Sequence, residues 1–397
     1  MFAATILKID LEEESVDRLT TREYAHKDFP GRTVNFRLLD DHYAEISKGA
    51  DPFSILLFGV GPLAGTLFPG ASTVSVVGQT SDTGEVVAGV LGGGMGTELK
   101  NVGYEQLMLT GIARTLSYLY IHNDFVEIRD AGFVKGKGIN EVEKLIRQDL
   151  DDEEVEVVAI GPAGENRESD SVIQCCITGL ASGPMLGSVM GSMNLKAIAV
   201  HGNGKGQVAE PGKFFECCSR IHVYLQSSSL KRDFLEEIDE RVRDFSNNYG
   251  IGKVGCYGCP LPCCENYDHP TLGAGVISRT IFSKVLQSAS TTDLFSLYEY
   301  FNACQESGLD PVSFADKQPW KTHPVNKSIL SEESMFAHMM GICPNLADHA
   351  MSCVSIERYA EALSYGVGKQ ITGEELLQQL ERTQALERKC LAMSRRR

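Results

Sequence analysis

The sequence predicts an α+β fold in which a strand-rich N-terminal part is followed by mostly α-helical domains. Up to about residue 207, short apolar or alternating segments lie between turns that contain glycine or proline, as is typical of strands. From about Pro211 onward, apolar residues recur at helical spacing beside charged residues. The 397 residues are too many for one ordinary core. We therefore expect domains at residues 1–207, 208–326 and 327–397.

The N-terminal part carries the clearest strand patterns. Phe2–Asp10 alternates apolar and polar residues, which predicts a half-buried strand. Tyr118–Ile121 and Phe125–Ile128 flank a short polar turn and predict a hairpin. Ile139–Leu150 has helical apolar spacing instead. Further strands are expected at Ser54–Val60, Thr73–Val77 and Val155–Ile160.

Helices are expected throughout the C-terminal part. The last of them opens with Thr372, followed three residues later by Glu375, which is the pattern of a capping box. Residues 311–327 contain three prolines and Trp320, and we expect an irregular connection there. The predicted helices are Lys213–Leu225, Leu230–Phe245, Thr292–Ser307, Ser331–Met340, Ile356–Tyr365 and Thr372–Met393.

The composition limits the possible partners and compartment. A formal charge of −16 and a pI near 5.1 argue against binding to nucleic acid or to an anionic membrane surface. No apolar stretch approaches the roughly 18–20 residues that span a bilayer. The twelve cysteines occur mainly as adjacent pairs and one tight cluster, which suits a reducing compartment. We expect a cytoplasmic protein without a membrane or nucleic-acid partner.

The cluster of cysteines is the most informative motif. Cys256, Cys259 and Cys263 are spaced C-x2-C-x3-C, and Cys264 follows directly. Thiols at these short gaps can turn toward one point, and soft thiolates suit an iron–sulfur cluster or zinc. Gly255 and Gly258 allow a tight backbone around such a centre, and two prolines stiffen the end of the segment. The segment therefore predicts a metal site.

The spacing favours a [4Fe–4S] cluster over zinc. Structural zinc sites usually show a second pair of ligands a dozen or more residues away, and no such pair follows Cys264. Three clustered cysteines with one remote cysteine are common in [4Fe–4S] sites. Cys343 is the best remote candidate, because a glycine two residues before it and a proline after it indicate a loop. Cys264 is the local alternative, although adjacent residues tend to point apart.

Several further motifs follow one another along the chain. They are Gly61–Thr66, Gly96–Lys100 with Gly103 and Tyr104, Ile160–Asn166, Val189–Ile198, Gly308–Asp310 and Gly341–Cys343. Together with the cysteine loop, they resemble the tungsten-dependent aldehyde:ferredoxin oxidoreductases in the order of that family. The resemblance implies an N-terminal domain of two β-sheets and two helical domains. It also implies a [4Fe–4S] cluster on Cys256, Cys259, Cys263 and Cys343.

The second cofactor that the resemblance implies is tungsten held by two pterins. Arg32, Gly93 and Asp310 stand at positions that match pterin contacts of the family. At other positions the chain lacks the polar or charged residue that the family pattern has. These positions are occupied by Thr73, Val90, Ala181–Pro184, Gln305 and His338. His338 is a possible ligand for iron or pterin, but we expect a solvated helix position for it. The chain is also shorter than family members between Asp310 and Ser331, so no catalytic residue is assigned.

Three functional hypotheses follow. The first is an oxidoreductase of an anaerobic metabolism that oxidises an aldehyde to a carboxylate and passes electrons through the cluster to ferredoxin. The second is a non-catalytic electron-transfer or assembly subunit that holds only the [4Fe–4S] cluster, since the tungstopterin positions are eroded. The third is a cofactor-free or zinc-binding structural paralogue. Ferredoxin or another redox protein is the expected partner of the first two, within a homo- or hetero-oligomer.

Overall fold

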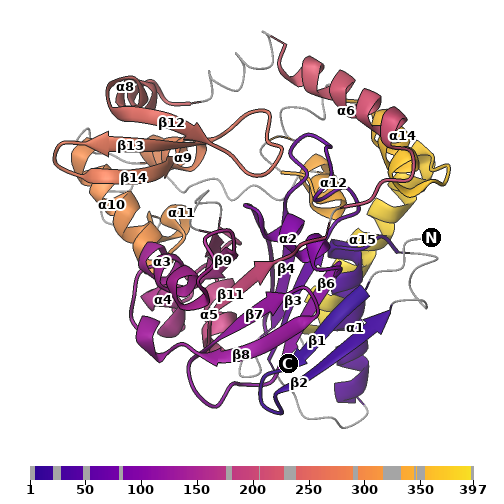
Figure 1. Ribbon diagram of the computed structural model, residues 1–397, viewed down its shortest axis with the longest axis horizontal. Helices are drawn as coiled ribbons and strands as arrows, with labels where there is room; N and C mark the ends of the chain where they lie inside the picture. The colour runs from indigo at the N-terminus through magenta and orange to yellow at the C-terminus, as the bar shows by residue number, and fades with distance from the viewer. Residues whose placement is uncertain are drawn as a thin grey trace.

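The predicted α+β class is confirmed. Two mixed sheets form the N-terminal part, and helices dominate the C-terminal part (Figure 1). The boundaries of the three expected domains remain a prediction. The computed structural model describes residues 5–20, 28–47, 54–79, 84–175, 181–204, 206–227, 238–288, 294–315, 332–343, 346 and 354–394.

The first sheet has six strands in the order β2-β1-β6-β3-β4-β5. β1 and β6 are parallel, and the other neighbours are antiparallel. The strands predicted at Phe2–Asp10, Ser54–Val60 and Thr73–Val77 correspond to β1, β3 and β4. The bounds are β1 (Thr5–Asp10), β2 (Ser15–Thr20), β3 (Ile55–Val60), β4 (Val74–Gln79), β5 (Val86–Leu91) and β6 (Gln106–Thr110).

The second sheet has five strands in the order β10-β9-β11-β7-β8. The predicted hairpin is confirmed as β7 and β8, which pair antiparallel. β7 also pairs with β11, and these two strands are parallel. The bounds are β7 (Ser117–His122), β8 (Phe125–Asp130), β9 (Glu156–Ala159), β10 (Gln174–Cys175) and β11 (Leu195–His201).

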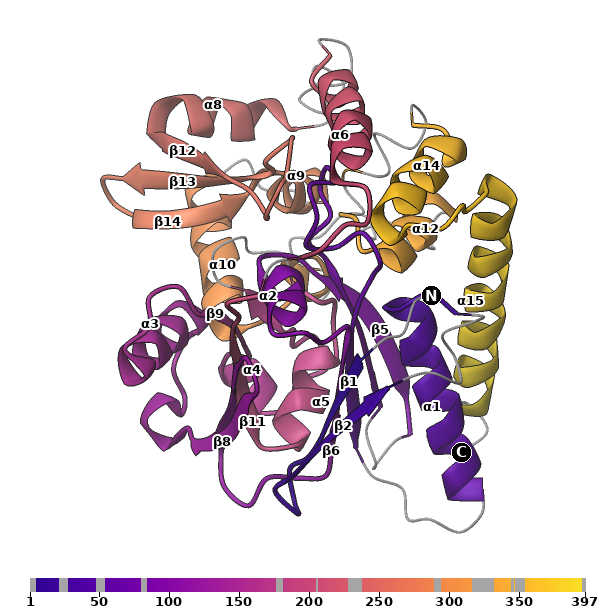
Figure 2. The ribbon, with the colours of Figure 1, turned by 45° about the vertical axis from the view of Figure 1, so that its right-hand side comes forward.

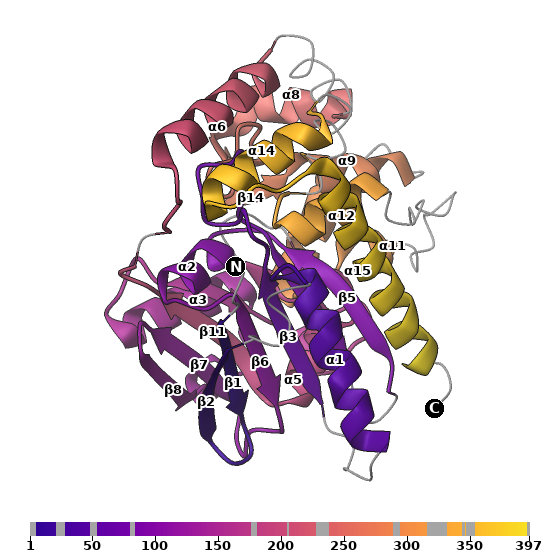
Figure 3. The same ribbon diagram turned by 90° about the vertical axis from the view of Figure 1, so that its right-hand side faces the viewer.

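The two sheets share one core, to which α2 and α5 contribute by contacting strands of both sheets, while α1 and α15 cover the outer face of the first sheet and α3 that of the second (Figures 2 and 3). Leu56 and Phe58 of β3 lie in the core between the sheets, whereas Ile55 and Leu57 pack against α1 and α15. Because both faces are covered, such strands are apolar along their whole length. The helices of this part are α1 (Arg32–Ser47), α2 (Met95–Asn101), α3 (Ile139–Leu150), α4 (Pro162–Glu165), α5 (Leu186–Ser192) and α15 (Gly373–Ser394).

A third, antiparallel sheet of three strands, which the sequence did not predict, carries the cysteine loop. The loop joins β12 to β13, and α8 and α9 pack against β13 (Figure 1). The last part of the helix expected at Leu230–Phe245 corresponds to α8, which begins at Glu240, and residues 230–237 lie outside the described residues. The bounds are β12 (Gly250–Val254), β13 (Cys264–His269), β14 (Gly273–Ser278), α6 (Pro211–Leu225), α8 (Glu240–Tyr249), α9 (Arg279–Ser288), α10 (Leu294–Ser307), α11 (Pro311–Ala315), α12 (Glu332–Met340) and α14 (Ile356–Val367).

The capping box that the sequence predicts for the last helix is confirmed. The backbone N–H of Thr372 donates to Glu375 Oε2 at 2.8 Å, and the N–H of Glu375 donates to Thr372 Oγ1 at 3.2 Å. The two residues thus satisfy backbone donors at the start of α15 reciprocally. Trp320 and most of the predicted connection at 311–327 lie outside the described residues. Within the described part of the chain, every helix is too short or too polar to cross a lipid bilayer.

A buried ion pair joins the first helix to the last. Arg32 at the start of α1 donates to Glu387 of α15, with Nη2 at 2.6 Å from Oε1 and Nε at 3.3 Å from Oε2. The side chain of Arg32 is 1% exposed and that of Glu387 is 13% exposed. The guanidinium also lies over the ring of Phe36, 5.2 Å from its centroid. Because Arg32 is buried, water cannot replace Glu387 as its partner when that carboxylate is removed.

We expect Glu387→Gln to lower the free energy of unfolding by about 3–5 kcal/mol, because it leaves the Arg32 guanidinium buried without a counter-charge. Chemical denaturation monitored by circular dichroism measures the loss. Glu381→Gln, on the exposed face of the same helix, is the matched control and should change stability by less than about 0.5 kcal/mol. Equal stabilities of the two variants would show that the ion pair does not fix α15 on α1.

Candidate metal centre

The cysteine loop is a tight turn between two strands. The N–H of Cys259 donates to the carbonyl of Cys256 at 3.0 Å, and Gly258 between them has a φ of +63°. That backbone conformation favours glycine, which explains the residue at this point. Arg279, at the start of α9, holds the far end of the loop: its Nη2 donates to Pro262 O at 2.6 Å and its backbone N–H donates to Cys263 O at 2.9 Å.

Gly70, from the N-terminal part, links this loop to the remote cysteine. Its N–H donates to the carbonyl of Gly258 at 3.0 Å, and its own carbonyl accepts from the N–H of Cys343 at 2.9 Å. Gly70 has a φ of +72°, and an added Cβ would lie 2.4 Å from Leu346 Cδ2. A larger residue would therefore clash as well as strain the backbone. Cys343 is thus held beside the cysteine loop although the sequence separates them widely.

The four predicted ligand cysteines share one electrostatic environment. Burial raises the pKa of Cys343 well above its usual value, and the neighbouring charges of Cys256, Cys263 and Cys259 raise it further. Burial, followed by the charges of Cys256 and Cys263, raises the pKa of Cys259 to about 12. Cys263 and Cys343 are buried, and the other two are partly exposed. At these raised pKa values the Cys259 and Cys343 thiols keep their protons unless a metal ion binds them.

Cys264, the alternative fourth ligand, is placed differently. It is the first residue of β13 and pairs in register with Val254 and Ser278. Its sulfur lies 3.9 Å from that of Cys263. The hydrogen bond between them lowers the pKa of Cys263 and raises that of Cys264 well above its usual value. The structure therefore pairs Cys264 with Cys263 as a hydrogen-bonding neighbour.

Arg279 is a residue of this centre that the sequence did not reveal. Its side chain is 5% exposed, and its Nε finds no hydrogen-bond partner within the described residues. Its charge contributes to the lowered pKa of Cys263, after the hydrogen bond from Cys264. No sequence pattern indicated it, because one arginine at a strand–helix junction is not distinctive. A buried guanidinium N–H beside the cysteines is suited to an anionic group there.

The three residues that match pterin contacts are engaged within the protein. Arg32 forms the ion pair with Glu387. An added Cβ on Gly93 would lie 2.7 Å from Cys175 Sγ and 2.9 Å from Glu156 Oε1, so side chains already fill the space beside it. Asp310 Oδ2 accepts from the backbone N–H of Ser313 at 2.9 Å. The structure does not bring these three residues together around an open space.

The expectation of a solvated His338 is wrong. The side chain is 5% exposed on α12, where burial and, after it, the charge of Arg32 lower its pKa well below the usual value. Its Nδ1 and the Oγ1 of Thr73 find no hydrogen-bond partner within the described residues. Thr73 lies close by, since its N–H donates to the carbonyl of Gly341 at 3.2 Å. The helical pattern of α12 could not reveal that β4 and α1 cover this face.

A pocket of about 490 Å³ lies beside the cysteine loop. Tyr257 lines one side of it, and Gly94 lines another. The N–H of Gly94 donates to Glu156 Oε1 at 2.6 Å, so a carboxylate already occupies the start of α2. Glu98 and Glu154 also line the pocket. These three carboxylates make the pocket unfavourable for a phosphate group.

Comparison with known proteins gives one consistent result. Residues 6–202 match the family model "Aldehyde ferredoxin oxidoreductase, N-terminal domain". The chain is 37% identical to the tungsten-containing aldehyde ferredoxin oxidoreductase of Pyrococcus abyssi, over 83% of this chain and 60% of that protein. It is 34% identical to an aliphatic sulfonate oxidoreductase, WOR-like subunit, of Pyrococcus furiosus, over 66% of this chain and 48% of that protein.

The chain thus spans about half to three fifths of the length of these curated relatives. Among solved structures, it is similar to a chain of the active site complex BamBC of benzoyl coenzyme A reductase, with a TM-score of 0.81. The similarity covers 98% of this chain and 88% of the other, at 18% identity, and so concerns the fold. The matched domain and the curated relatives agree with the motifs and the two-sheet architecture. The chain belongs to the aldehyde ferredoxin oxidoreductase family.

Proposed function

We propose that this chain is an iron–sulfur redox protein that holds one [4Fe–4S] cluster on Cys256, Cys259, Cys263 and Cys343. The observation that supports this most strongly is the pair of hydrogen bonds from Gly70, which hold Cys343 beside the other three cysteines. When bound, the cluster supplies one-electron transfer, and the expected partner is ferredoxin or another redox protein. The name of the WOR-like relative, a subunit, supports an assembly with other chains.

The absence of a tight group of thiols argues for a cubane rather than zinc. Zinc binds thiolates at about 2.3 Å in a tetrahedron, which places the sulfurs about 3.8 Å apart. Among the described residues, no three thiols lie within 4.8 Å of one another. A cubane binds each cysteine at a separate iron and does not need so tight a group.

The buried guanidinium of Arg279 also fits this cluster. A cubane bound by four thiolates is an anion, and hydrogen bonds and nearby charges tune its reduction potential. The Nε of Arg279 has no partner within the described residues and its charge acts on Cys263. Arg279 can therefore balance part of the negative charge of the cluster. Cys264, as a hydrogen-bonding neighbour of Cys263, would affect the same sulfur without binding iron.

The residues present do not fit a tungsten bis-pterin. Such a group carries several negative phosphate charges, and the one matching arginine, Arg32, is already neutralised by Glu387. Side chains of Cys175 and Glu156 fill the space beside Gly93, and Asp310 caps α11. Each missing charge-assisted hydrogen bond would forfeit about 1.5–3 kcal/mol. We therefore assign the electron-transfer role without a tungsten centre.

An active aldehyde oxidoreductase is the second candidate, and one observation favours it. Polar atoms of Arg32, Thr73 and His338 are buried and find no hydrogen-bond partner within the described residues. These residues lie where α1, β4 and α12 meet. A bound cofactor could satisfy such atoms. The relatives named tungsten-containing aldehyde ferredoxin oxidoreductases are in agreement with this candidate.

Metal analysis of protein purified without air separates the two candidates. We expect about four iron atoms per chain and the electron paramagnetic resonance spectrum of a reduced cubane. We expect no stoichiometric tungsten or molybdenum, and no pterin released on denaturation. One tungsten with pterin per chain would establish the second candidate instead. Zinc without iron would contradict both and support the structural paralogue.

Substitution of single cysteines tests the fourth ligand. Cys343→Ala should lower the iron content of protein purified without air, because one iron loses its thiolate. Its electron paramagnetic resonance spectrum should no longer be that of a reduced cubane. Cys264→Ala should keep the full iron content and shift only the reduction potential, since it removes a hydrogen bond to Cys263. Cys390→Ala, at a buried cysteine of α15 that packs against α1, controls for the effect of a lost buried thiol. Iron loss in Cys264→Ala but not in Cys343→Ala would reverse the assignment.

A further inference from the structure

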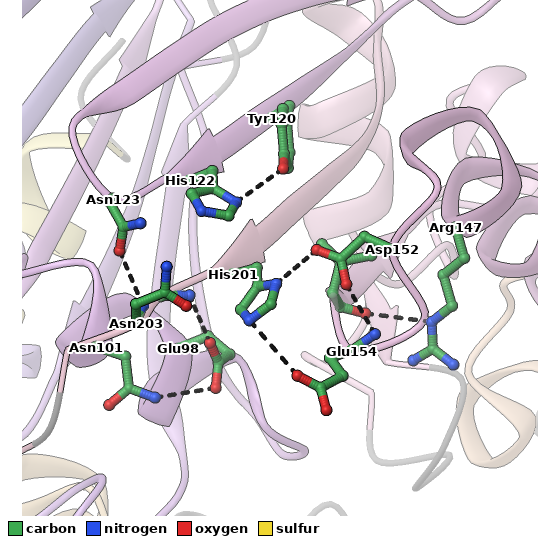
Figure 4. Close-up of polar contacts among 12 residues, drawn as sticks. Glu98, Asn101, Tyr120, His122, Asn123, Arg147, Asp152, Glu154, His201 and Asn203 are labelled. Atoms are coloured by element: carbon green, nitrogen blue, oxygen red, sulfur yellow. Dashed lines mark hydrogen bonds and ion pairs between the residues drawn. The ribbon is translucent and has the colours of Figure 1, made fainter.

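Two histidines are held side by side at the ends of two parallel strands, away from the cysteine loop. His122 ends β7 and His201 ends β11, and the two residues are partners in the register of the second sheet. Their ring centroids are 5.2 Å apart, with an angle of 56° between the ring planes (Figure 4). Register-paired residues on neighbouring strands project to the same face of a sheet. The sheet itself therefore brings the two imidazoles together.

A carboxylate from a third segment reaches the same point. Asp152 follows α3, and its Oδ2 lies 2.5 Å from His201 Nδ1 (Figure 4). The loop is fixed on both sides of it, because the N–H of Glu154 donates to Asp152 Oδ1 at 2.9 Å and Arg147 Nε donates to Val155 O at 3.2 Å. Ligand atoms of His122, Asp152 and His201 all lie within 4.8 Å of one another, and the three side chains are partly exposed.

Neighbouring polar groups orient the histidines. Tyr120, two residues before His122 on β7, places its hydroxyl 3.0 Å from His122 Nδ1 (Figure 4). Glu154 Oε2 lies 3.9 Å from His201 Nε2, and the Glu154 side chain is 88% exposed. Histidines that bind metals are usually oriented by a second polar group in this way. An exposed carboxylate at this distance is free to move toward a bound ion.

An ion pair between Asp152 and His201 would explain those two residues without a metal. It does not explain why a second imidazole, held by Tyr120, has a ring nitrogen within 4.8 Å of the ligand atoms of this pair. Two imidazoles and a carboxylate are a common ligand set for zinc and for other divalent first-row transition metals. Three protein ligands also leave a position for water or for Glu154.

We propose that His122, His201 and Asp152 form a binding site for one divalent transition-metal ion. The ion would join β7, β11 and the loop after α3, and it would reach the site from solvent. Its ligands are nitrogen and oxygen atoms, which separates it chemically from the thiolate centre. The proposal does not depend on which cofactor the cysteines bind.

Zinc added to the anaerobic protein with its native cofactors tests the site. After the removal of adventitious metal, we expect the protein to bind one Zn²⁺ per chain in equilibrium dialysis. Zinc-edge X-ray absorption should give nitrogen and oxygen ligands at about 2.0–2.1 Å, whereas thiolate ligands would lie at about 2.3 Å. Absorption at the zinc edge comes from zinc alone, so the iron of the cluster does not contribute to it. A sulfur shell, or no bound zinc, would overturn the proposal.

Substitutions assign the ion to these residues. His122→Ala and His201→Ala should each lower the zinc affinity at least about a hundredfold, since a lost ligand costs more than the 10–100-fold loss typical of second-shell changes. Tyr120→Phe keeps both ligands and should lower the affinity about tenfold. His222→Ala, an exposed histidine on α6, should bind zinc as the unchanged protein does. Unchanged affinity in folded His122→Ala would overturn the proposal.

Discussion

The candidate redox centre depends on two backbone hydrogen bonds made by one glycine. Gly70 donates to Gly258 in the cysteine loop and accepts from Cys343, so it fixes the remote cysteine against the three local ones. Its positive φ and the close approach of Leu346 leave no room for a side chain. Gly70 belongs to the N-terminal part, which therefore completes a site whose thiols all come from the C-terminal part. A centre of this kind cannot form unless both parts fold and dock.

The two-sheet sandwich gives Gly70 a rigid support. The segment that carries it connects β3 to β4, two central strands buried on both faces. One face packs in the core between the sheets and the other packs under α1 and α15. In that outer layer α1 and α15 lie side by side (Figures 2 and 3), and the Arg32–Glu387 ion pair joins them. Side chains far from the cysteines thus help to hold the centre, because they fix the strands on either side of Gly70.

Local patterns in the sequence predicted more than long-range contacts did. The spacing of Cys256, Cys259 and Cys263, the β7–β8 hairpin and the α15 capping box depend on near neighbours, and the last two are confirmed. α1 was missed because it is covered by a sheet on one side and a helix on the other, which removes the apolar stripe. β12 was missed because most of it is exposed and contains two glycines. Glu387, the partner of Arg32, and Gly70, the hydrogen-bond partner of Cys343, lie too far along the chain for any local pattern to reveal.

The proposed loss of the tungsten site without loss of the cluster has a physical basis. The cysteine centre is held mainly by backbone groups of Gly70, Gly258 and Cys343, which most substitutions elsewhere leave unchanged. A charged pterin instead depends on individual side chains, and each can be replaced or paired internally, as Arg32 is by Glu387. Once one arginine is neutralised, the phosphates lose much of their attraction. The remaining pterin contacts can then be lost one at a time without unfolding the sandwich.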